Sequence, residues 1–389
     1  MSLATDSEYP ARDGSVDLAA AVERFVAAEV TPEVGEWDRA DDLPAAAIER
    51  MVELGLPGAL VPAEYGGAGL GVADVAPIWR ALSRGWISLT GAINPTGLAT
   101  TLLVRHGTAE QKRRWLPAIA RGELLASFSI TEPQAGSDLR RIETTARPLA
   151  DGGFVLDGDK RWVAGGASSG VIFMLAGVAG ADRPSCLVLP ADGRGERGWI
   201  VGEIDKVGYR GVESSAYRFD GFASRDAEIL GGGDGLGGGV AQMIDALEVG
   251  RVNVACRGLG ILDRAIARSI EECREREIGD GVLGDHTHAQ LRLGEMVARR
   301  DAVEALIERA AVAVDAGEER AGALATAAKL NASEAAVWAV DQAARLAASR
   351  SYTAGEELAR LRRDAPQTQI GEGANDALLL SLAKPLLDV

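Results

Sequence analysis

Glu372 is the residue whose surroundings point most directly to chemistry, because it is a single carboxylate between two glycines in residues 369–376. Gly371 and Gly373 have no Cβ atoms, so another molecule can approach the backbone closely there. A glutamate held beside such a point could act as a general base. An exposed glutamate in a glycine turn is the simpler interpretation of these eight residues when they are taken alone.

The segments on either side of Glu372 are both expected to be ordered. Upstream, a charged run ends at Pro366, and downstream residues 376–384 read as an apolar helix. Asn375 is a suitable N-cap for that helix, because its side chain can accept an orphan N–H of the first turn.

A second stretch, residues 128–138, leaves a predicted strand and enters a Pro/Gly loop with hydroxyls at Thr131 and Ser137. Gly136 and Ser137 offer free backbone N–H groups and an O–H donor, which suit a phosphate or a carbonyl. An ordinary turn, in which Asp138 caps the residues that follow, explains the stretch equally well.

A third stretch, residues 160–166, places Trp162 at a strand end beside two glycines. An indole in that position could stack on a planar ring system. Taken alone, a core position for Trp162 is the simpler interpretation.

The elements that must position these residues follow the order α, β, α. Residues 1–15 read as a loose tail, and helical periodicity then extends to about residue 123. Thr108 and Gln111 form a capping-box pattern that opens a helix over residues 112–121. Residues 43–54 and 72–82 also show one apolar face, and a glycine-rich loop at residues 58–69 separates them.

Short strand-like runs fill residues 125–230, with turn signals at short intervals, as in an antiparallel sandwich or barrel. Residues 155–160 are expected to join two such runs through a turn. From Val240 the chain is alanine-rich and helical, which suggests a bundle of about four helices. The predicted domains are therefore residues 1–124, 125–231 and 232–389.

Residues 233–238 match G-x-G-x-x-G, but a dinucleotide fold would then require a parallel strand ending in an acidic residue. Uninterrupted helix follows instead, so a flexible interdomain connection is the better account of this glycine run. The match gives little support to a nicotinamide cofactor.

Composition restricts the classes of function. The chain has 389 residues and a formal net charge of -16, which argues against a general nucleic-acid or anionic-membrane surface. Its three cysteines are widely spaced, so free thiols in a reducing compartment are expected. The three histidines suggest no metal site, the N-terminus has no signal-peptide h-region, and we expect no membrane-spanning run.

Several motifs, in order along the chain, resemble those of the acyl-CoA dehydrogenase superfamily. The similar segments are residues 55–67, 107–117, 131–138, 206–211, 250–251 and 363–373. The resemblance implies an α+β fold with an N-terminal helical domain, a central antiparallel β domain and a C-terminal four-helix bundle. It also implies FAD, and Glu372 as the base that removes the α-proton of an acyl thioester.

The resemblance assigns further residues to the site. Gly250 stands where some members carry the base, which strengthens the case for Glu372. Substrate contacts are expected from Ser137, Arg251, Gly371 and Gly373. Cofactor contacts are expected from Phe128, Ile130, Thr131, Gly136, Ser137, Trp162, Val163, Ala164, Arg274, Arg276, Arg345, Ala374 and Asp376.

Some of these positions depart from the family pattern. Ala164 and Ala374 replace residues that usually carry a flavin-binding hydroxyl. A neighbouring subunit usually supplies an arginine to the cofactor, and here Glu275 occupies that register, so Arg274, Arg276 or Arg345 is expected to substitute. Gly371 replaces a common tyrosine, which predicts a wider pocket for a branched or bulky acyl group.

The expected protein is an FAD-dependent dehydrogenase that acts on an acyl-CoA or acyl-carrier-protein thioester. It would be a cytoplasmic homotetramer, or a dimer, and would pass electrons to an electron-transfer flavoprotein or a similar acceptor. One alternative is a flavin monooxygenase-like relative. A second is a non-catalytic relative that binds an acyl carrier or a partner protein and has an impaired FAD site.

Overall fold

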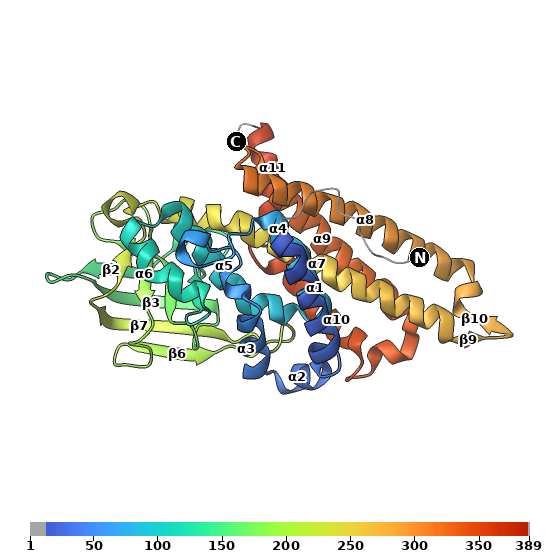
Figure 1. Cartoon of the computed structure of the whole chain (residues 1–389). Coiled ribbons are helices and arrows are strands. Elements are labelled where there is room, and N and C mark those ends of the chain that lie inside the picture. The colour runs from blue at the N-terminus through green and yellow to red at the C-terminus, as the bar shows by residue number, and fades with distance from the viewer. Residues whose placement is uncertain (1–12, 388–389) are drawn as a thin grey trace.

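The computed structural model of the protein describes residues 13–387. Its elements follow the expected order, with helices first, a sheet next and helices last. Figure 1 shows the sheet at one end of the molecule and long helices extending from it to the other end. The predicted fold class is confirmed.

Six α-helices form the first part of the described chain. The tail expected over residues 1–15 is too long, because the first helix begins at Asp13; residues 1–12 lie outside the described residues. The predicted capping box is present, since Thr108 Oγ1 accepts from the Gln111 N–H at 3.2 Å and Gln111 Oε1 accepts from the Thr108 N–H at 3.0 Å. The helices are α1 Asp13–Phe25, α2 Val34–Ala40, α3 Ala45–Glu53, α4 Val72–Gly85, α5 Ile87–His106 and α6 Ala109–Ala120.

Helix α5 corrects one expectation from the sequence. By length and composition it could cross a membrane, although no such run was expected. In the fold, 83% of its most apolar 18-residue stretch is buried. Its side chains contribute to two separate apolar clusters of the core. Its composition therefore reflects a core helix, which packs against α4, α6 and α7.

The central sheet has the strand order β6-β7-β3-β2-β4-β5-β8, and β1 pairs with β4. Most neighbours are antiparallel as expected, but β1 and β2 both pair with β4 in parallel, which the sequence did not indicate. The strands are β1 Ala126–Ser129, β2 Thr145–Pro148, β3 Phe154–Ala164, β4 Val171–Val178, β5 Ser185–Pro190, β6 Trp199–Glu203, β7 Ser214–Ser224 and β8 Glu228–Ile229.

The turn predicted within residues 155–160 is wrong, because β3 continues through it. Asp157 and Gly158 lie inside the strand, at a register shift against β7. Gly158 has a φ of +136°, and a Cβ there would lie 2.6 Å from the Thr144 Cα. An Asp-Gly pair that usually signals a turn here allows an irregularity and a close backbone approach.

The glycine run before α7 is packed, which corrects the expectation of a flexible connection. A Cβ at Gly235 would lie 1.8 Å from the Leu230 carbonyl oxygen, and one at Gly239 would lie 2.3 Å from the Ser185 carbonyl carbon. These glycines let the start of α7 dock tightly on β5.

Long helices form the last part, as expected. A short hairpin of β9 Glu277–Ile278 and β10 Gly281–Val282 joins α7 to α8. The 37 residues of α7 span about 55 Å at 1.5 Å per residue, so this helix connects the sheet to the far hairpin (Figure 1). The helices are α7 Gly239–Glu275, α8 Thr287–Ala316, α9 Ala321–Ala347, α10 Glu357–Ile370 and α11 Asn375–Leu387.

Candidate active site

Glu372 lies in the short connection between α10 and α11, and its backbone is left-handed with a φ of +54°. Non-glycine residues adopt this conformation rarely, and it is concentrated at functional sites. Gly373 follows at a φ of +108°, a region that favours glycine. The side chain of Glu372 is partly buried, so the exposed turn considered from the sequence is not what forms.

The carboxylate of Glu372 sits between α5 and α7. Its Oε1 accepts from Asn94 Nδ2 at 2.8 Å. Gly250 on α7 faces it so closely that a Cβ there would lie 3.0 Å from the Glu372 Cδ. The position that sequence reasoning considered for an alternative base is therefore in contact with Glu372 itself, and it leaves room for that carboxylate.

Burial raises the pKa of Glu372 above its ordinary value, since a charged carboxylate is disfavoured away from water. The positive charge of Arg257, the hydrogen bond from Asn94, and the charges of Arg251 and Lys329 all oppose this rise. A carboxylate with a raised pKa in a confined site is suited to accept a proton near neutral pH.

Lys329 on α9 holds the segment around Glu372 through three hydrogen bonds. Its Nζ donates to the Gly373 carbonyl at 2.7 Å, to the Gln369 carbonyl at 3.1 Å and to Asn375 Oδ1 at 2.6 Å. Burial lowers the pKa of Lys329 to about 8. The predicted role of Asn375 as a helix cap is wrong, because its amide binds α9 through Lys329 and Ser333.

The other predicted substrate residues surround the base. Arg251 Nε donates to the Glu372 carbonyl at 3.5 Å, and its Nη1 donates to Thr326 Oγ1 at 3.2 Å. Gly371 has ordinary backbone angles of -60° and 146°, so its conformation does not require glycine. A Cβ there would meet Gln367 Nε2 at 2.7 Å, so an amide occupies the space that a larger side chain would need.

Sequence reasoning missed four residues of this site: Asn94, Tyr209, Arg257 and Lys329. Asn94, Arg257 and Lys329 are polar side chains within largely apolar helical runs, and each is almost fully buried. A polar side chain at a buried position is unusual unless it has a hydrogen-bond partner. The polar residues within these apolar runs were therefore the feature of the sequence that could have indicated the site.

The predicted flavin-lining residues lie at the ends of β1 and β3. The Thr131 carbonyl accepts from the Arg161 N–H at 2.9 Å, which joins the two strand ends. Phe128 and Ile130 are partly exposed there. Trp162 is 56% exposed and has a φ of +61°, so it is not a core residue. An exposed indole beside apolar side chains fits a flat aromatic ring such as a flavin.

A buried ion pair, which the sequence did not reveal, fixes this surface. Lys160 Nζ donates to Glu132 Oε1 at 2.7 Å and to the Ile130 carbonyl at 3.1 Å. Glu132 also accepts from the N–H groups of Glu143 and Thr144. The pair thus ties the loop that follows β1 to the strand that carries Trp162.

The remaining predicted residues of the β domain differ in what they offer. Gly136 and Ser137 are exposed, and a Cβ at Gly136 would meet nothing within 4 Å, so a ligand can reach that backbone. Val163 is fully buried in the apolar core of the sheet, which contradicts a cofactor contact by its side chain.

The Ala164 carbonyl accepts from Ser127 Oγ at 2.9 Å. Asp138 caps the next turn through the Arg140 N–H, as the alternative interpretation expected.

The predicted cationic contacts lie at the opposite end of α7. Arg274 is in its last turn, and Arg276 Nη1 donates to the Leu346 carbonyl at 2.7 Å, next to Arg345 at the end of α9. Arg345 is exposed and pairs with Asp341 at 2.7 Å. Ala374 and Asp376 lie beside the base, at the start of α11. One chain therefore does not bring all the predicted cofactor residues together.

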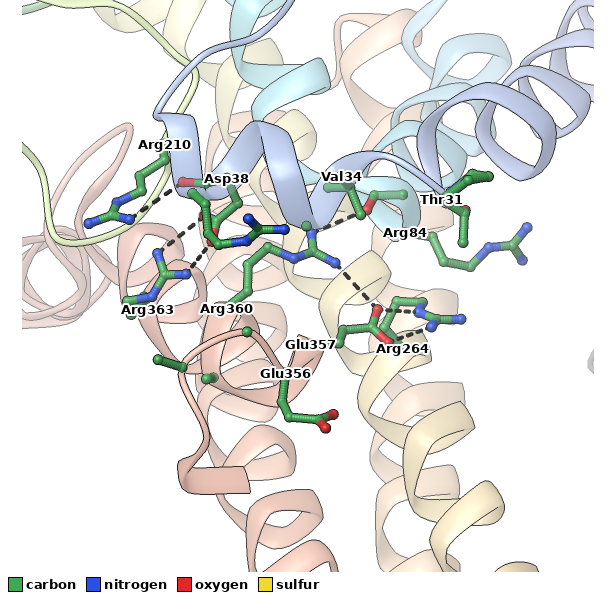
Figure 2. A pocket seen from close by; sticks show the side chains of 17 residues that line it. Thr31, Val34, Asp38, Arg84, Arg210, Arg264, Glu356, Glu357, Arg360 and Arg363 are labelled. Atoms are coloured by element: carbon green, nitrogen blue, oxygen red, sulfur yellow. Dashed lines mark hydrogen bonds and ion pairs between the residues drawn. The ribbon is translucent and has the colours of Figure 1, made fainter. Parts of the chain in front are cut away.

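A cavity of about 540 Å³ lies apart from this site, between the N-terminal helices and the start of α10. Figure 2 shows its charged side chains facing one another: Asp38 pairs with Arg363, and Glu357 pairs with Arg264 and Arg360. Neither Glu372 nor Trp162 lines it. These arginines are thus engaged within the protein, and the pair between Asp38 and Arg363 connects the N-terminal helices to α10 across the cavity. Its six arginines are Arg39, Arg84, Arg210, Arg264, Arg360 and Arg363.

Three domain models of one protein family match the chain in order. They are the N-terminal domain of acyl-CoA dehydrogenase over residues 13–123, the middle domain over residues 127–222 and the C-terminal domain over residues 237–387. Together they cover nearly all of the described residues.

Individual proteins and structures are also similar over almost the whole chain. The (2S)-methylsuccinyl-CoA dehydrogenase of Cereibacter sphaeroides is 30% identical over 377 residues, which cover 94% of this chain and 68% of that protein. The structure of glutaryl-coenzyme A dehydrogenase with glutaryl-CoA has a TM-score of 0.90 at 26% identity and covers 98% of this chain and 97% of that one. The prolyl acyl carrier protein oxidase AnaB has a TM-score of 0.88 at 25% identity and covers 97% of this chain and 100% of that one.

Proposed function

The chain belongs to the acyl-CoA dehydrogenase family, and on that premise we propose that Glu372 is the base that removes the α-proton of an acyl thioester. The enzyme is an FAD-dependent oxidoreductase that acts on a CH–CH group. The observation that carries the proposal is the confined carboxylate of Glu372, which burial biases toward accepting a proton and which Asn94 holds between α5 and α7.

The reaction converts a saturated acyl thioester into a 2,3-enoyl thioester. Glu372 takes the proton from the α-carbon, and the β-carbon loses a hydride, so the two carbons form a double bond. FAD, when bound, supplies the acceptor for that hydride. The protein directs the proton to one carboxylate oxygen, because Asn94 already occupies Oε1.

Residues around the base orient the thioester. The backbone N–H of Glu372 donates to the thioester carbonyl and stabilises the negative charge that develops there, as an oxyanion-hole donor does. Lys329 keeps that backbone in its left-handed conformation through its bond to the Gly373 carbonyl. On the α7 side the space beside the carboxylate is closely packed, because a Cβ at Gly250 would lie 3.0 Å from the Glu372 Cδ and 3.1 Å from a methyl of Leu98.

FAD would be held by two groups of residues from different copies of the chain. Phe128, Thr131 and Trp162 of one copy would line its ring, and Ser137 and the backbone at Gly136 would bind its phosphates. Arg276 and Arg345 of another copy would supply positive charge, since α7 separates them from the sheet of their own chain. This arrangement is the basis for proposing a homo-oligomer, either a dimer or a tetramer.

The acyl group is branched or bulky near its β-carbon, because Gly371 has no side chain of its own beside the base. The Gln367 amide, 2.7 Å from the position of a Cβ at Gly371, turns away to make that room. The thioester is carried by CoA or by an acyl-carrier protein. Electrons then pass to an electron-transfer flavoprotein or a similar acceptor. A cytoplasmic location agrees with three buried cysteines that form no disulfide.

An anaerobic titration of the purified protein tests this function. Acyl thioesters of different shape are added while the visible flavin absorbance is recorded, and a dehydrogenase is bleached by substrate alone. Glu372→Gln should still bind the thioester but should not be bleached. Bleaching that needs an external reductant would favour a monooxygenase-like enzyme, and protein that cannot be reconstituted with FAD would favour a non-catalytic relative. Full activity in Glu372→Gln would overturn the assignment of the base.

A further inference from the structure

Arg257 on α7 is a buried guanidinium, only 2% exposed, and its hydrogen-bond partners are neutral. Its Nε donates to Asn253 Oδ1 at 2.9 Å, and its Nη1 donates to the Tyr209 hydroxyl at 2.9 Å. Other buried arginines, such as Arg300 and Arg360, pair with carboxylates. No ion pair found within residues 13–387 includes Arg257. A buried charge without a counter-charge is unfavourable, so this one calls for an explanation.

Tyr209 holds Arg257 in place and is itself fixed by the surrounding structure. Its φ is +56°, which is rare for an aromatic residue, and its N–H donates to Asp364 Oδ1 at 2.7 Å. Its ring lies 5.4 Å from the Arg257 guanidinium. On the other side its hydroxyl fills the space at Gly91, where a Cβ would lie only 1.9 Å from that oxygen. Glycine at position 91 is therefore needed for Tyr209 to reach Arg257.

This assembly lies beside the base. Gly91 and Asn94 are one turn apart on α5, about 4.5 Å along the helix, and Asn94 contacts Glu372. On α7, Gly250 faces Glu372, and Asn253 and Arg257 follow in the next two turns. Tyr209 and Arg257 therefore lie about two turns further along the same contact between α5 and α7 that holds the carboxylate, and the charge of Arg257 acts on Glu372 from there.

The charged groups around Glu372 differ in how they are engaged. Helix α9 contributes Lys329, which is committed to three acceptors, and α7 contributes Arg251, which binds Thr326 and the Glu372 carbonyl. Helix α10 contributes Asp364, which binds the Tyr209 N–H, and α5 contributes only the neutral Asn94. Among the influences that lower the pKa of Glu372, the charge of Arg257 is the largest.

We propose that Arg257, held by Tyr209 and Asn253, is a positioning residue that supplies the counter-charge needed to keep Glu372 ionised before it accepts the α-proton. The proposal rests on the proposed role of Glu372 as the base. It explains both unusual features together: an arginine without a carboxylate partner at close range, and a tyrosine in a strained conformation that fixes that arginine.

The test compares the pH dependence of kcat in Arg257→Met, Arg257→Lys and Tyr209→Phe with that of the wild type. Arg257→Met should move the acidic limb of the profile to higher pH by about one unit, which is about a tenfold loss of kcat below that limb. Arg257→Lys keeps the charge and should restore most of the profile. Tyr209→Phe removes one oxygen and should shift the limb in the same direction by less. Thioester affinity should change little in all three.

A second readout does not depend on turnover or on bound FAD. The infrared band of the protonated Glu372 carboxyl, identified by its loss in Glu372→Gln, should persist to higher pH in Arg257→Met than in the wild type. An unmoved limb and an unmoved band in folded Arg257→Met would overturn the proposal. If Arg257→Met does not fold, unchanged profiles in Tyr209→Phe would do so. Bleaching that survives in Glu372→Gln would instead overturn the proposed function on which it rests.

Discussion

Asn94 donates its side-chain amide to Oε1 of Glu372 at 2.8 Å, although 278 positions separate the two residues in the sequence. The bond connects the N-terminal helices to the loop that carries the base. A hydrogen bond to the charged form of a carboxylate favours that form, so Asn94 opposes the rise in the pKa of Glu372 that burial causes.

Replacing Asn94 with leucine should therefore raise the pKa of Glu372 further. A hydrogen bond to a charged group contributes about 1.5–3 kcal/mol, so we expect at least about a tenfold fall in kcat on the acidic side of the profile. The rate of anaerobic flavin bleaching, measured against pH, is the direct test. Asn94→Gln, which keeps an amide, serves as the matched control. An identical pH profile in Asn94→Leu would show that the bond does not act on the base.

Lys329 predicts a pH dependence of stability. Its folded-state pKa is lowered to about 8 from an ordinary value of 10.5, so the folded protein binds this proton less tightly than the unfolded chain does. The penalty of burying its charge is full below about pH 8 and disappears as the pH rises through 10.5. The unfolding free energy of the wild type, relative to Lys329→Met, should rise across that window in urea titrations. A constant difference between pH 7 and 10.5 would contradict the lowered pKa.

Gly371 predicts the shape of the substrate. Gly371→Tyr should reduce the turnover of branched acyl thioesters more than that of straight ones, because the ring must enter the space beside the base. The structure adds that the ring must first displace the Gln367 amide, which lies 2.7 Å from the position of a Cβ. The double variant Gly371→Tyr/Gln367→Ala should therefore recover straight-chain turnover. Unchanged kcat/KM for branched substrates in Gly371→Tyr would refute the pocket-widening role.

The Glu132–Lys160 pair predicts how firmly the flavin surface is held. Lys160→Met leaves the Glu132 carboxylate buried without its cation, which typically costs about 3–5 kcal/mol. FAD should dissociate more readily, because the loop after β1 loses its tie to β3. The double variant Glu132→Gln/Lys160→Met should be less damaging than the single one. Urea unfolding and the fluorescence of released FAD measure the two effects, and equal FAD retention in Lys160→Met and wild type would contradict this role.

Local signals in the sequence predicted much of the fold. The capping box at Thr108 and Gln111 forms as predicted, because both of its bonds join residues three positions apart. The long alanine-rich runs became α7, α8 and α9, since one periodicity continues through each of them. Asp157-Gly158 misled the prediction, because the same two residue types suit a turn and a strand irregularity, and only contact with Thr144 distinguishes the two.

The site was predictable only where one short segment contains it. Glu372 and its two glycines were evident because they are adjacent in the sequence. Asn94 on α5 binds the same carboxylate, and Arg257 on α7 and Lys329 on α9 act on it through their charges. No spacing within any one of these helices reveals that the three residues converge on Glu372. The exposure of Trp162 was likewise not evident, because an indole beside glycines, taken alone, favoured a core position, whereas the residue is 56% exposed.

The length of α7 has a consequence for handling the protein. The helix separates Trp162 from Arg276 within one chain. If one FAD contacts both residues, it must therefore bind at the junction between two copies of the chain. Cofactor retention would then follow mass action in the protein itself, and dilution would favour release of FAD along with dissociation of the copies. Adding FAD would promote association of the copies. The flavin absorbance of a stored sample would therefore depend on how far the protein had been diluted, as well as on how much of it remained folded.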